Sequence, residues 1–447
     1  MQPPRRRSTA DRLRLWPILV VLPLSFLVVL AGLVGLTLAA WTWLHHPALP
    51  RPRSLSLHDW IGVLQLVFAS VAGAGALVAL LVAYRRQRVA EADSAHDRTR
   101  VFNERFTTIA GQLGNSQAAV RLAGVHAMAG LADDWQENRR TCVDVLCAYL
   151  RMPYDPDPGV AAPPADRLAF GASREVRHSL IRVISAHLQP GASTSWQGLD
   201  LDFTDVQFDG GDFTGAQFSG GSIRFCGAQF SSGKVDFSAA QFSGANVDFG
   251  HSQFSGGTVS FGGAKFSGGK VDFGYAQFGG RSVYFGDAQF SGADVNLAGA
   301  QFTRGMVRFG GATFSGGIVN FGGAHFVRGM VRFGGAHFAG GTVDFGHARF
   351  SGGSVRFGGG QVTGGIVRFA GAKFSGSSVY FGDAQFSGGT VDFAGAKFAG
   401  GMVRFGHARF SGGTVDLSRP SDWSRPPTFS FTGTPPPGVL LPPRWTP

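Results

Sequence analysis

A twelve-residue pattern, Phe-Ser-Gly-Gly-x-Val-x-Phe-Gly-x-Ala-x, repeats about seventeen times between Phe218 and Leu417. Self-similarity at so short a fixed period is typical of a solenoid, in which each unit buries its apolar face only against its neighbours. The high glycine and phenylalanine content of the chain, 67 Gly and 41 Phe in 447 residues, is concentrated in these repeats. The pattern therefore predicts an architecture, and it predicts no activity.

Each repeat contains a short strand signal followed by a corner. Val235 and Phe237 alternate with Asp236, which is the period of a strand with one buried face. Glycine pairs suit the corners because glycine accepts positive φ. A turn of twelve residues leaves too little room for two Phe, a Val and an Ala in each ~4.8 Å layer. We therefore predict a turn of about 24 residues, rather than 20 or 12.

A 24-residue turn sorts the outward residues between Val and Phe into two columns. One column is acidic or amide and the other is basic or aromatic. We predict that the two columns form different faces of the rod and hold the surface for any partner. The candidate residues are Arg308, Arg332, Arg356 and Arg404 on one column, and Asp248, Asp272, Asp344 and Asp392 on the other. A structure with Asp344 and Arg356 in one column would contradict this hypothesis.

Two apolar runs precede the repeats, at 16–40 and 60–84, and neither contains a charged residue. Each is long enough to cross a bilayer as a helix. Arginines flank their outer ends, so the positive-inside rule places both termini in the cytoplasm. We therefore predict a basic N-terminus (1–15), a transmembrane hairpin (16–84) and a multi-pass protein of the plasma membrane. A cleaved signal peptide is the less favoured alternative for the first run, which exceeds the usual length of such a segment.

Small residues at a spacing of four within 69–76 predict close helix packing, either of the hairpin on itself or of two copies as a homodimer. Residues 85–190 then change to helical periodicity and predict a helical connector. Ser116 and Ser173 are the expected N-caps of two of its helices, and 154–164 is an expected loop because it holds four prolines.

Residue types that carry catalysis or bind metals are sparse and badly spaced. The three cysteines, Cys142, Cys147 and Cys226, match no zinc or redox motif. His126, His178 and His187 lack the carboxylate spacing of a metal site, so we interpret them as surface or capping residues. The sequence therefore predicts no enzyme, no cofactor and no metal site.

Four five-residue units open the repeat domain, at 201–205, 206–210, 211–215 and 216–220, each with a central Phe. Here the chain resembles the pentapeptide-repeat family, and its connector is similar to that found before the repeats of actinobacterial membrane proteins. The resemblance covers 199–417 and implies a right-handed, four-sided β-helix with the central residue inward. After Phe218 the spacing changes to five plus seven. The Pro-rich tail, 418–447, is expected to be extended or to cap the last turn.

Charge constrains the partner. The whole chain carries +11, but 201–417 holds 16 Lys and Arg against 13 Asp, which is only +3. We predict a membrane-anchored scaffold that presents a repetitive surface to a cytoplasmic protein. Electrostatic binding of nucleic acid or anionic lipid by the arginine column is an alternative. DNA mimicry of the gyrase-protecting type requires an acidic rod and is less favoured, and an enzyme or sensor in the connector is the remaining class.

Overall fold

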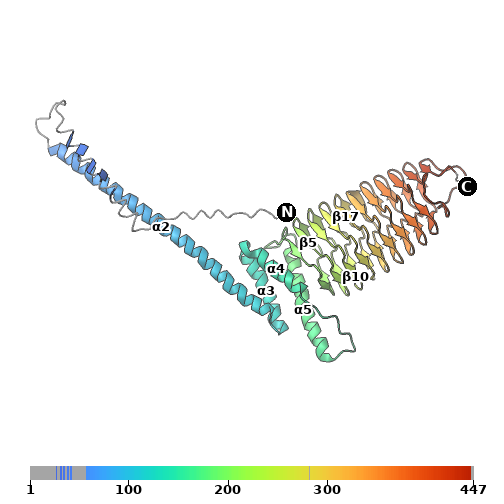
Figure 1. Cartoon of the computed structure of the whole chain (residues 1–447), viewed down its shortest axis with the longest axis horizontal. Helices are drawn as coiled ribbons and strands as arrows, with labels where there is room; N and C mark the ends of the chain where they lie inside the picture. Colours follow the sequence, from blue (N-terminus) through green and yellow to red (C-terminus); the bar gives the residue numbers. More distant parts are fainter. Residues whose placement is uncertain are drawn as a thin grey trace. The chain divides into compact units, whose positions relative to one another are not determined.

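The computed structural model describes residues 57–280 and 282–443, together with single residues between 27 and 42. The chain divides into two units, 1–101 and 102–447, and each is considered by itself. A 57-residue helix, α2 (Leu57–Leu113), begins in the first unit and ends in the second. The second unit holds three further α-helices and a long parallel β-solenoid (Figure 1).

The predicted transmembrane hairpin is corrected by the structure. The run at 60–84 is not a helix of its own, because α2 continues beyond it through Arg85, Arg88 and Glu91. The run at 16–40 falls mostly outside the described residues. Across the described part of the chain, no helix has both the length and the apolar character needed to cross a bilayer. The predictions of two transmembrane helices and of a plasma-membrane location with both termini cytoplasmic were therefore wrong.

The helices of the second unit are α3 (Ala118–Asp134), α4 (Arg139–Arg151) and α5 (Pro164–His187), with a 3-10 turn, η1 (Gln136–Asn138), between α3 and α4. We had predicted that Ser116 and Ser173 are N-caps, and the structure shows that neither is. α3 begins after Gln117, with no side-chain capping bond. α5 begins earlier than predicted because Pro164, whose fixed φ suits a first helical turn, starts it.

The helices bury their apolar faces against one another and against the first turns of the solenoid. Val125, Leu146 and Leu180 are each fully buried, one from each helix. Trp196, which follows α5, is also fully buried. α4 contacts β1 and α5 contacts β3, so the helices cover the N-terminal end of the solenoid core.

Four parallel sheets, named A to D in the order in which the chain visits them, form the walls of the solenoid. The strands of sheet A are β1 (Leu201–Asp202), β5 (Ser222–Arg224), β9 (Asn246–Asp248), β13 (Lys270–Asp272), β17 (Asp294–Asn296), β21 (Ile318–Asn320), β25 (Thr342–Asp344), β29 (Ile366–Arg368), β33 (Thr390–Asp392), β37 (Thr414–Asp416) and β39 (Val439–Leu440). Those of sheet B are β2 (Gln207–Phe208), β6 (Gln229–Phe230), β10 (Gln253–Phe254), β14 (Gln277–Phe278), β18 (Gln301–Phe302), β22 (His325–Phe326), β26 (Arg349–Phe350), β30 (Lys373–Phe374) and β34 (Lys397–Phe398).

The remaining two walls complete the square. The strands of sheet C are β3 (Gly211–Asp212), β7 (Lys234–Asp236), β11 (Thr258–Ser260), β15 (Ser282–Tyr284), β19 (Met306–Arg308), β23 (Met330–Arg332), β27 (Ser354–Arg356), β31 (Ser378–Tyr380), β35 (Met402–Phe405) and β38 (Thr428–Phe429). Those of sheet D are β4 (Gln217–Ser219), β8 (Gln241–Ser243), β12 (Lys265–Phe266), β16 (Gln289–Ser291), β20 (Thr313–Gly316), β24 (His337–Phe338), β28 (Gln361–Val362), β32 (Gln385–Phe386) and β36 (Arg409–Phe410).

The strand register confirms the predicted turn of 24 residues. Val271 pairs with Val295 and Val247 on sheet A, and Val331 pairs with Val307 and Val355 on sheet C. The first turn is shorter, since Leu201 pairs with Ile223. Two repeats therefore close one turn, and sheets A and C lie on opposite sides of it.

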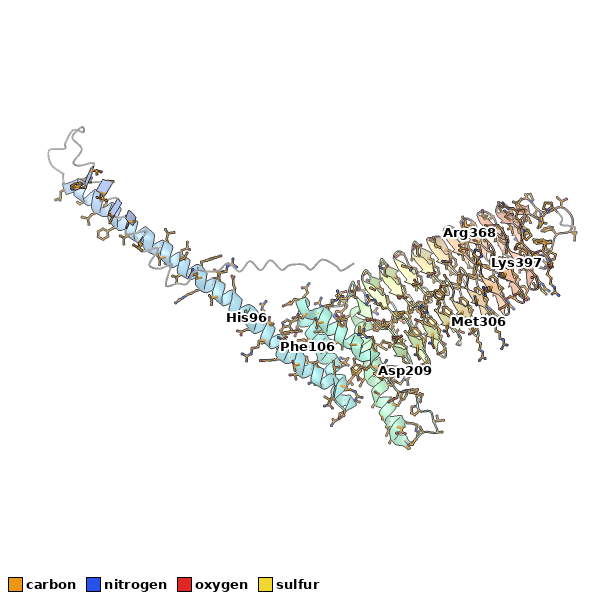
Figure 2. The ribbon with its side chains drawn as sticks, viewed as in Figure 1. His96, Phe106, Asp209, Met306, Arg368 and Lys397 are labelled. Carbon is orange, nitrogen blue, oxygen red and sulfur yellow. The ribbon has the colours of Figure 1, made fainter. Side chains whose placement is uncertain are left out.

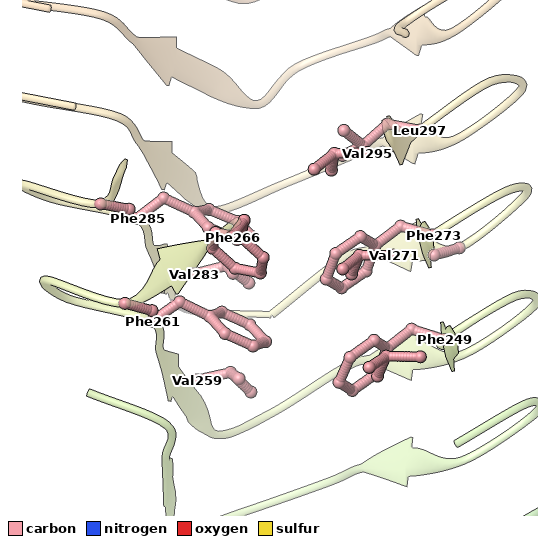
Figure 3. Close-up of a cluster of buried hydrophobic side chains, with 14 of the residues drawn as sticks. Phe249, Val259, Phe261, Phe266, Val271, Phe273, Val283, Phe285, Val295 and Leu297 are labelled. Carbon is pink, nitrogen blue, oxygen red and sulfur yellow. The ribbon is translucent and has the colours of Figure 1, made fainter. Parts of the chain in front are cut away.

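Phenylalanine rings fill most of the interior in stacks, and Leu297 interrupts the stack behind sheet A (Figure 3). Phe249 lies 4.7 Å from Phe273 in the next turn with the planes 4° apart, and it meets Phe261 edge-on across the core at 5.8 Å. Such offset and edge-on contacts add to the ~1.5–3 kcal/mol that each buried ring contributes by leaving water. The volume of the buried rings therefore sets the turn length, because only a turn made of two repeats encloses enough space for this packing.

Two kinds of corner join the sheets. Where sheet A passes to B and where C passes to D, one residue has positive φ, and non-glycine residues such as His251 and His347 adopt it at 58° and 57°. Where B passes to C and D passes to A, successive turns approach closely. A Cβ on Gly353 would lie 2.1 Å from the Gly329 carbonyl oxygen, and one on Gly269 would lie 2.2 Å from that of Ala245. At these two positions the neighbouring turn leaves no room for a Cβ, so glycine is required.

The Pro-rich tail folds back over the last turns. Trp423 meets Phe398 edge-on at 5.3 Å, Phe429 stacks on Phe405 at 5.0 Å, and β39 extends sheet A. One interior defect lies beneath this end, on sheet D, where Val362 occupies a usual Phe position. Gly360, Val362 and the neighbouring rings line an apolar cavity of about 10 Å³, which is too small and too apolar to hold a water molecule.

Candidate functional site

On sheet A, the outward residue between the Val and the Phe of each repeat stabilises the backbone of the following corner. Oδ1 of Asp248, Asp344 and Asp392 accepts a hydrogen bond from the backbone N–H two residues later, at 2.7, 2.7 and 2.8 Å respectively. Asn320 makes the same bond at 2.7 Å. These Asx turns satisfy an amide at the corner between sheets A and B. We name this set of outward residues the sheet A column.

The same position on sheet C mostly lacks this bond. Asp236 and Ser260 still accept it, at 3.0 and 3.4 Å. Beyond them the position holds Tyr284, Arg308, Arg332, Arg356, Tyr380 and Arg404. Arginine has only donors and cannot accept a hydrogen bond from an N–H. The sheet C column therefore forgoes a capping bond that sheet A makes repeatedly.

Three of the four arginines of the sheet C column stack on neighbouring tyrosines instead, and the fourth, Arg332, has its Nε 2.8 Å from Met330 Sδ. The Arg308 guanidinium lies 5.2 Å from the centre of the Tyr284 ring. Those of Arg356 and Arg404, from the turns on either side, lie 5.5 and 5.9 Å from the Tyr380 ring. Among the described residues, none of the arginines of this column forms an ion pair with a carboxylate. Their charge is therefore held in place and left uncompensated.

Sheet B extends this positive charge around one corner. Its outward column begins with Gln207 and Gln229 and ends with Arg349, Lys373 and Lys397, all three exposed. Lys397 lies near the C-terminal end of the solenoid in Figure 2. Arg304 and Arg328 lie on the corner between sheets B and C. We define the basic face by these described cations: Arg304, Arg308, Arg328, Arg332, Arg349, Arg356, Lys373, Lys397 and Arg404.

No acidic residue lies on the basic face within the described part of 237–405. All seven Asp of that stretch lie on sheet A or on the corner between sheets C and D: Asp248, Asp272, Asp287, Asp294, Asp344, Asp383 and Asp392. On sheet A the acids also meet local cations. Lys270 Nζ lies 2.7 Å from Asp272 Oδ2, and Arg368 NH1 lies 3.9 Å from Asp344 Oδ2. Positive and negative charge are thus separated around the rod.

The structure places the eight predicted residues on the two predicted columns. Arg332 pairs in register with Arg308 and Arg356, while Asp344 pairs with Asn320 and Arg368. Asp344 and Arg356 therefore lie on opposite sheets. Sequence reasoning missed the contribution of sheet B, although a basic residue at every 24th position from Arg349 was a readable signal.

A buried polar cluster at the N-terminal end was also missed. Asp209, only 6% exposed, is bonded by Tyr154 Oη at 2.8 Å, His178 Nε2 at 2.8 Å and Arg174 Nε at 3.0 Å. Burial alone would raise the pKa of Asp209, but the hydrogen bonds from His178 and Tyr154 outweigh it and lower that pKa. Burial, followed by the bond to the Asp209 anion, raises the pKa of Tyr154. These bonds lock α5 to β2.

A second cluster closes the helical connector. Asp133 accepts hydrogen bonds from Trp196 Nε1 and His187 Nε2, both at 3.0 Å. His187 Nδ1 lies 2.7 Å from the Val183 carbonyl oxygen, so each ring nitrogen faces an oxygen atom of the connector. His178 and His187 are therefore half-buried structural residues rather than surface ones. Among the described residues, no group of three or more His, Cys, Asp or Glu side chains could hold a metal ion.

Comparison with known proteins identifies the repeats. Residues 369–419 match the family model described as pentapeptide repeats (9 copies). No curated protein and no solved structure matches the chain. The matched segment lies within the parallel sheets described above and shares their 24-residue register. The matched part of this β-solenoid, 369–419, is therefore similar to the pentapeptide repeats of that family.

Proposed function

We propose that this chain is a non-enzymatic scaffold whose solenoid binds an acidic partner protein along the basic face. One observation carries the proposal: nine cations gather on two adjoining sheets and their shared corner, with no acid among them in the described part of 237–405. Uncompensated charge of one sign on a rigid surface attracts a partner of the opposite sign and orients it.

The cost of the sheet C column supports this proposal. Each arginine there replaces a residue type that caps the corner on sheet A, and a hydrogen bond of this kind contributes about 1 kcal/mol. Residues that break a local rule repeatedly without a structural gain are expected at functional surfaces. The sheet A column needs no partner to explain it, because its bonds to the backbone already do.

The test measures binding of a defined acidic polypeptide, poly-L-glutamate, to the full chain at low salt. Changing Arg308, Arg332, Arg356 and Arg404 to Gln is expected to weaken binding at least tenfold. The matched control changes four cations outside the basic face, Lys265, Lys270, Arg368 and Arg409, to Gln. The control removes the same charge and is expected to weaken binding less than threefold. Equal loss in both variants would contradict a localised binding face.

Binding of nucleic acid by the same face is a second candidate, favoured by the two rows of cations on sheets B and C. The tyrosines support it less, because Arg356 and Arg404 already cover Tyr380, and a covered ring cannot stack on a base. A 20-base-pair duplex tested beside poly-L-glutamate separates the candidates. Tighter binding of the duplex, with a steep salt dependence that is lost in the four-arginine variant, would favour nucleic acid.

A further inference from the structure

The opposite charges of the sheet A and sheet C columns lie on opposite sides of the same solenoid. The chain visits the sheets in the order A, B, C, D, so sheets A and C face away from each other. A second copy displaced sideways, without rotation, therefore brings its sheet A against sheet C of the first copy. A contact between two different faces of identical copies can be repeated from copy to copy.

The spacing along the two columns favours such a partner. Successive residues of each column are joined by strand pairing, so they lie about 4.8 Å apart. Carboxylates on one face of an extended strand recur at about 6.6 Å instead, and phosphates of a duplex follow a helical path. A ladder of arginines that is matched over several turns needs acids with the same rise, which another parallel solenoid supplies.

The order of residues along the columns is complementary at equal heights. Half a turn, twelve residues, separates the sheet A and sheet C positions of one layer. Arg356 and Arg404 follow Asp344 and Asp392 by half a turn, which places them within about 2.4 Å of the height of those aspartates along the rod. The strands of sheets A and C run in opposite directions across the rod. When sheet A of one copy faces sheet C of another, the two column residues therefore lie at opposite ends of the facing strands. Arginine is long enough to span that width.

The exceptions in the columns also match. The sheet A column has one arginine among its acids and amides between 246 and 416, Arg368, and the residue at its height on sheet C is Tyr380. An arginine opposite another arginine would repel, whereas a tyrosine ring attracts a cation. Arg308 and Arg332 lie at the heights of Asn296 and Asn320, whose amides carry no like charge.

From these observations, and resting on the proposed function, we infer that the acidic partner of the sheet C column is sheet A of a second copy of this chain, in parallel and at equal height. The capping bond of Asp392 uses Oδ1, and the described residues give its Oδ2 no partner, so that oxygen can accept from an arginine of the neighbour. A face three residues wide is smaller than a standard interface, so each contact is weak and salt-dependent.

The test is sedimentation velocity of the full chain from low to high protein concentration, at 20 and at 500 mM salt. We expect concentration-dependent association at 20 mM salt, weakened at least tenfold at 500 mM. Arg356→Gln with Arg404→Gln, and separately Asp344→Asn with Asp392→Asn, are each expected to weaken association at least fivefold. Asparagine keeps the capping bond, as Asn320 shows, so the second variant removes charge without unfolding the corner.

The matched control is Lys265→Gln with Arg409→Gln, which removes two exposed cations from sheet D, outside the basic face, and is expected to leave association within twofold. Association that is equally weakened in the control, or absent at all concentrations, would overturn the inference. If poly-L-glutamate still binds in that case, the proposed function survives without it. If neither association nor binding occurs, both are overturned. Preference for a duplex over a second copy would assign the column to nucleic acid instead.

Discussion

The sheet A and sheet C columns occupy the same position of the same repeat and differ in what the position does. On sheet A, Asp and Asn accept a backbone N–H at the corner, as at Asp344 and Asn320. On sheet C, Arg308 and Arg356 cannot, and they stack on tyrosines that face outward. The backbone and the core are alike on both sides. The comparison therefore separates residues that serve the fold from residues that the fold alone does not explain.

The largest expected effect is the same on both sides. Phe345, behind sheet A, and Phe261, behind sheet C, are fully buried, and each stacks on a ring in both adjacent turns. Either residue changed to Ala is expected to lower the free energy of unfolding by about 3–5 kcal/mol. Chemical denaturation of the full chain measures it. A difference above about 2 kcal/mol between the two variants would show that the cores differ, and the comparison of surfaces would lose its common reference.

The inward-facing Val362, on sheet D, is expected to be a packing defect of the core. Val362 on sheet D replaces a stacked Phe, and a cavity of about 10 Å³ remains. Val362→Phe restores the ring stack between Phe338 and Phe386, and cavity-filling changes typically stabilise by about 0.5–2 kcal/mol. Thermal unfolding checks this gain. Destabilisation would mean that the wall has closed around the smaller residue, since Gly360 also replaces the usual Ala.

The capping bond predicts opposite outcomes at equivalent positions. Asp344→Ala removes a bond of 2.7 Å and is expected to cost about 1 kcal/mol, whereas Asp344→Asn is expected to be nearly neutral. Arg356→Asp adds an acceptor at a corner that lacks one and is expected to stabilise by a few tenths of a kcal/mol to 1 kcal/mol. Denaturation midpoints compare the three variants. Destabilisation by Arg356→Asp would show that sheet C corners cannot use the cap.

The smallest expected effect is the contribution of Asp272, on sheet A, to the pH dependence of stability. Burial alone would raise the pKa of Asp272, but hydrogen bonds from Lys270, Gly274 and Asn296 lower it overall. Because the folded pKa lies below the unfolded one, the stabilisation is present at neutral pH and is lost as pH falls through the folded pKa.

Stability of the full chain, measured between pH 7 and pH 2, is expected to fall by a few tenths of a kcal/mol less in Asp272→Asn than in the unmodified chain. Arg356→Gln is the control on sheet C, and it is expected to leave the pH profile unchanged because arginine does not titrate in this range. Identical profiles for Asp272→Asn and the unmodified chain would mean that Asp272 is not held by its three donors.

Several features were readable before the structure, because they depend on period and volume. Val and Phe at a spacing of two marked the strands, and the bulk of the rings required a 24-residue turn, which the pairing of Val271 with Val295 confirms. The two columns followed from the same arithmetic. The membrane hairpin and the caps at Ser116 and Ser173 were wrong, because local apolar runs and single polar residues do not reveal where a helix begins and how far it continues.

The sequence by itself determined the repeat, the inward and outward alternation, and the identity of the two charged columns, since each is a periodic property of neighbouring residues. Only the tertiary structure decided that sheet B joins sheet C in one acid-free face, that the aspartates of sheet A cap corners, and that Asp209 locks α5 to β2 through Tyr154 and His178. The physical reason is that these contacts depend on which segments the closed turn and the packed helices bring together, and no local spacing encodes that.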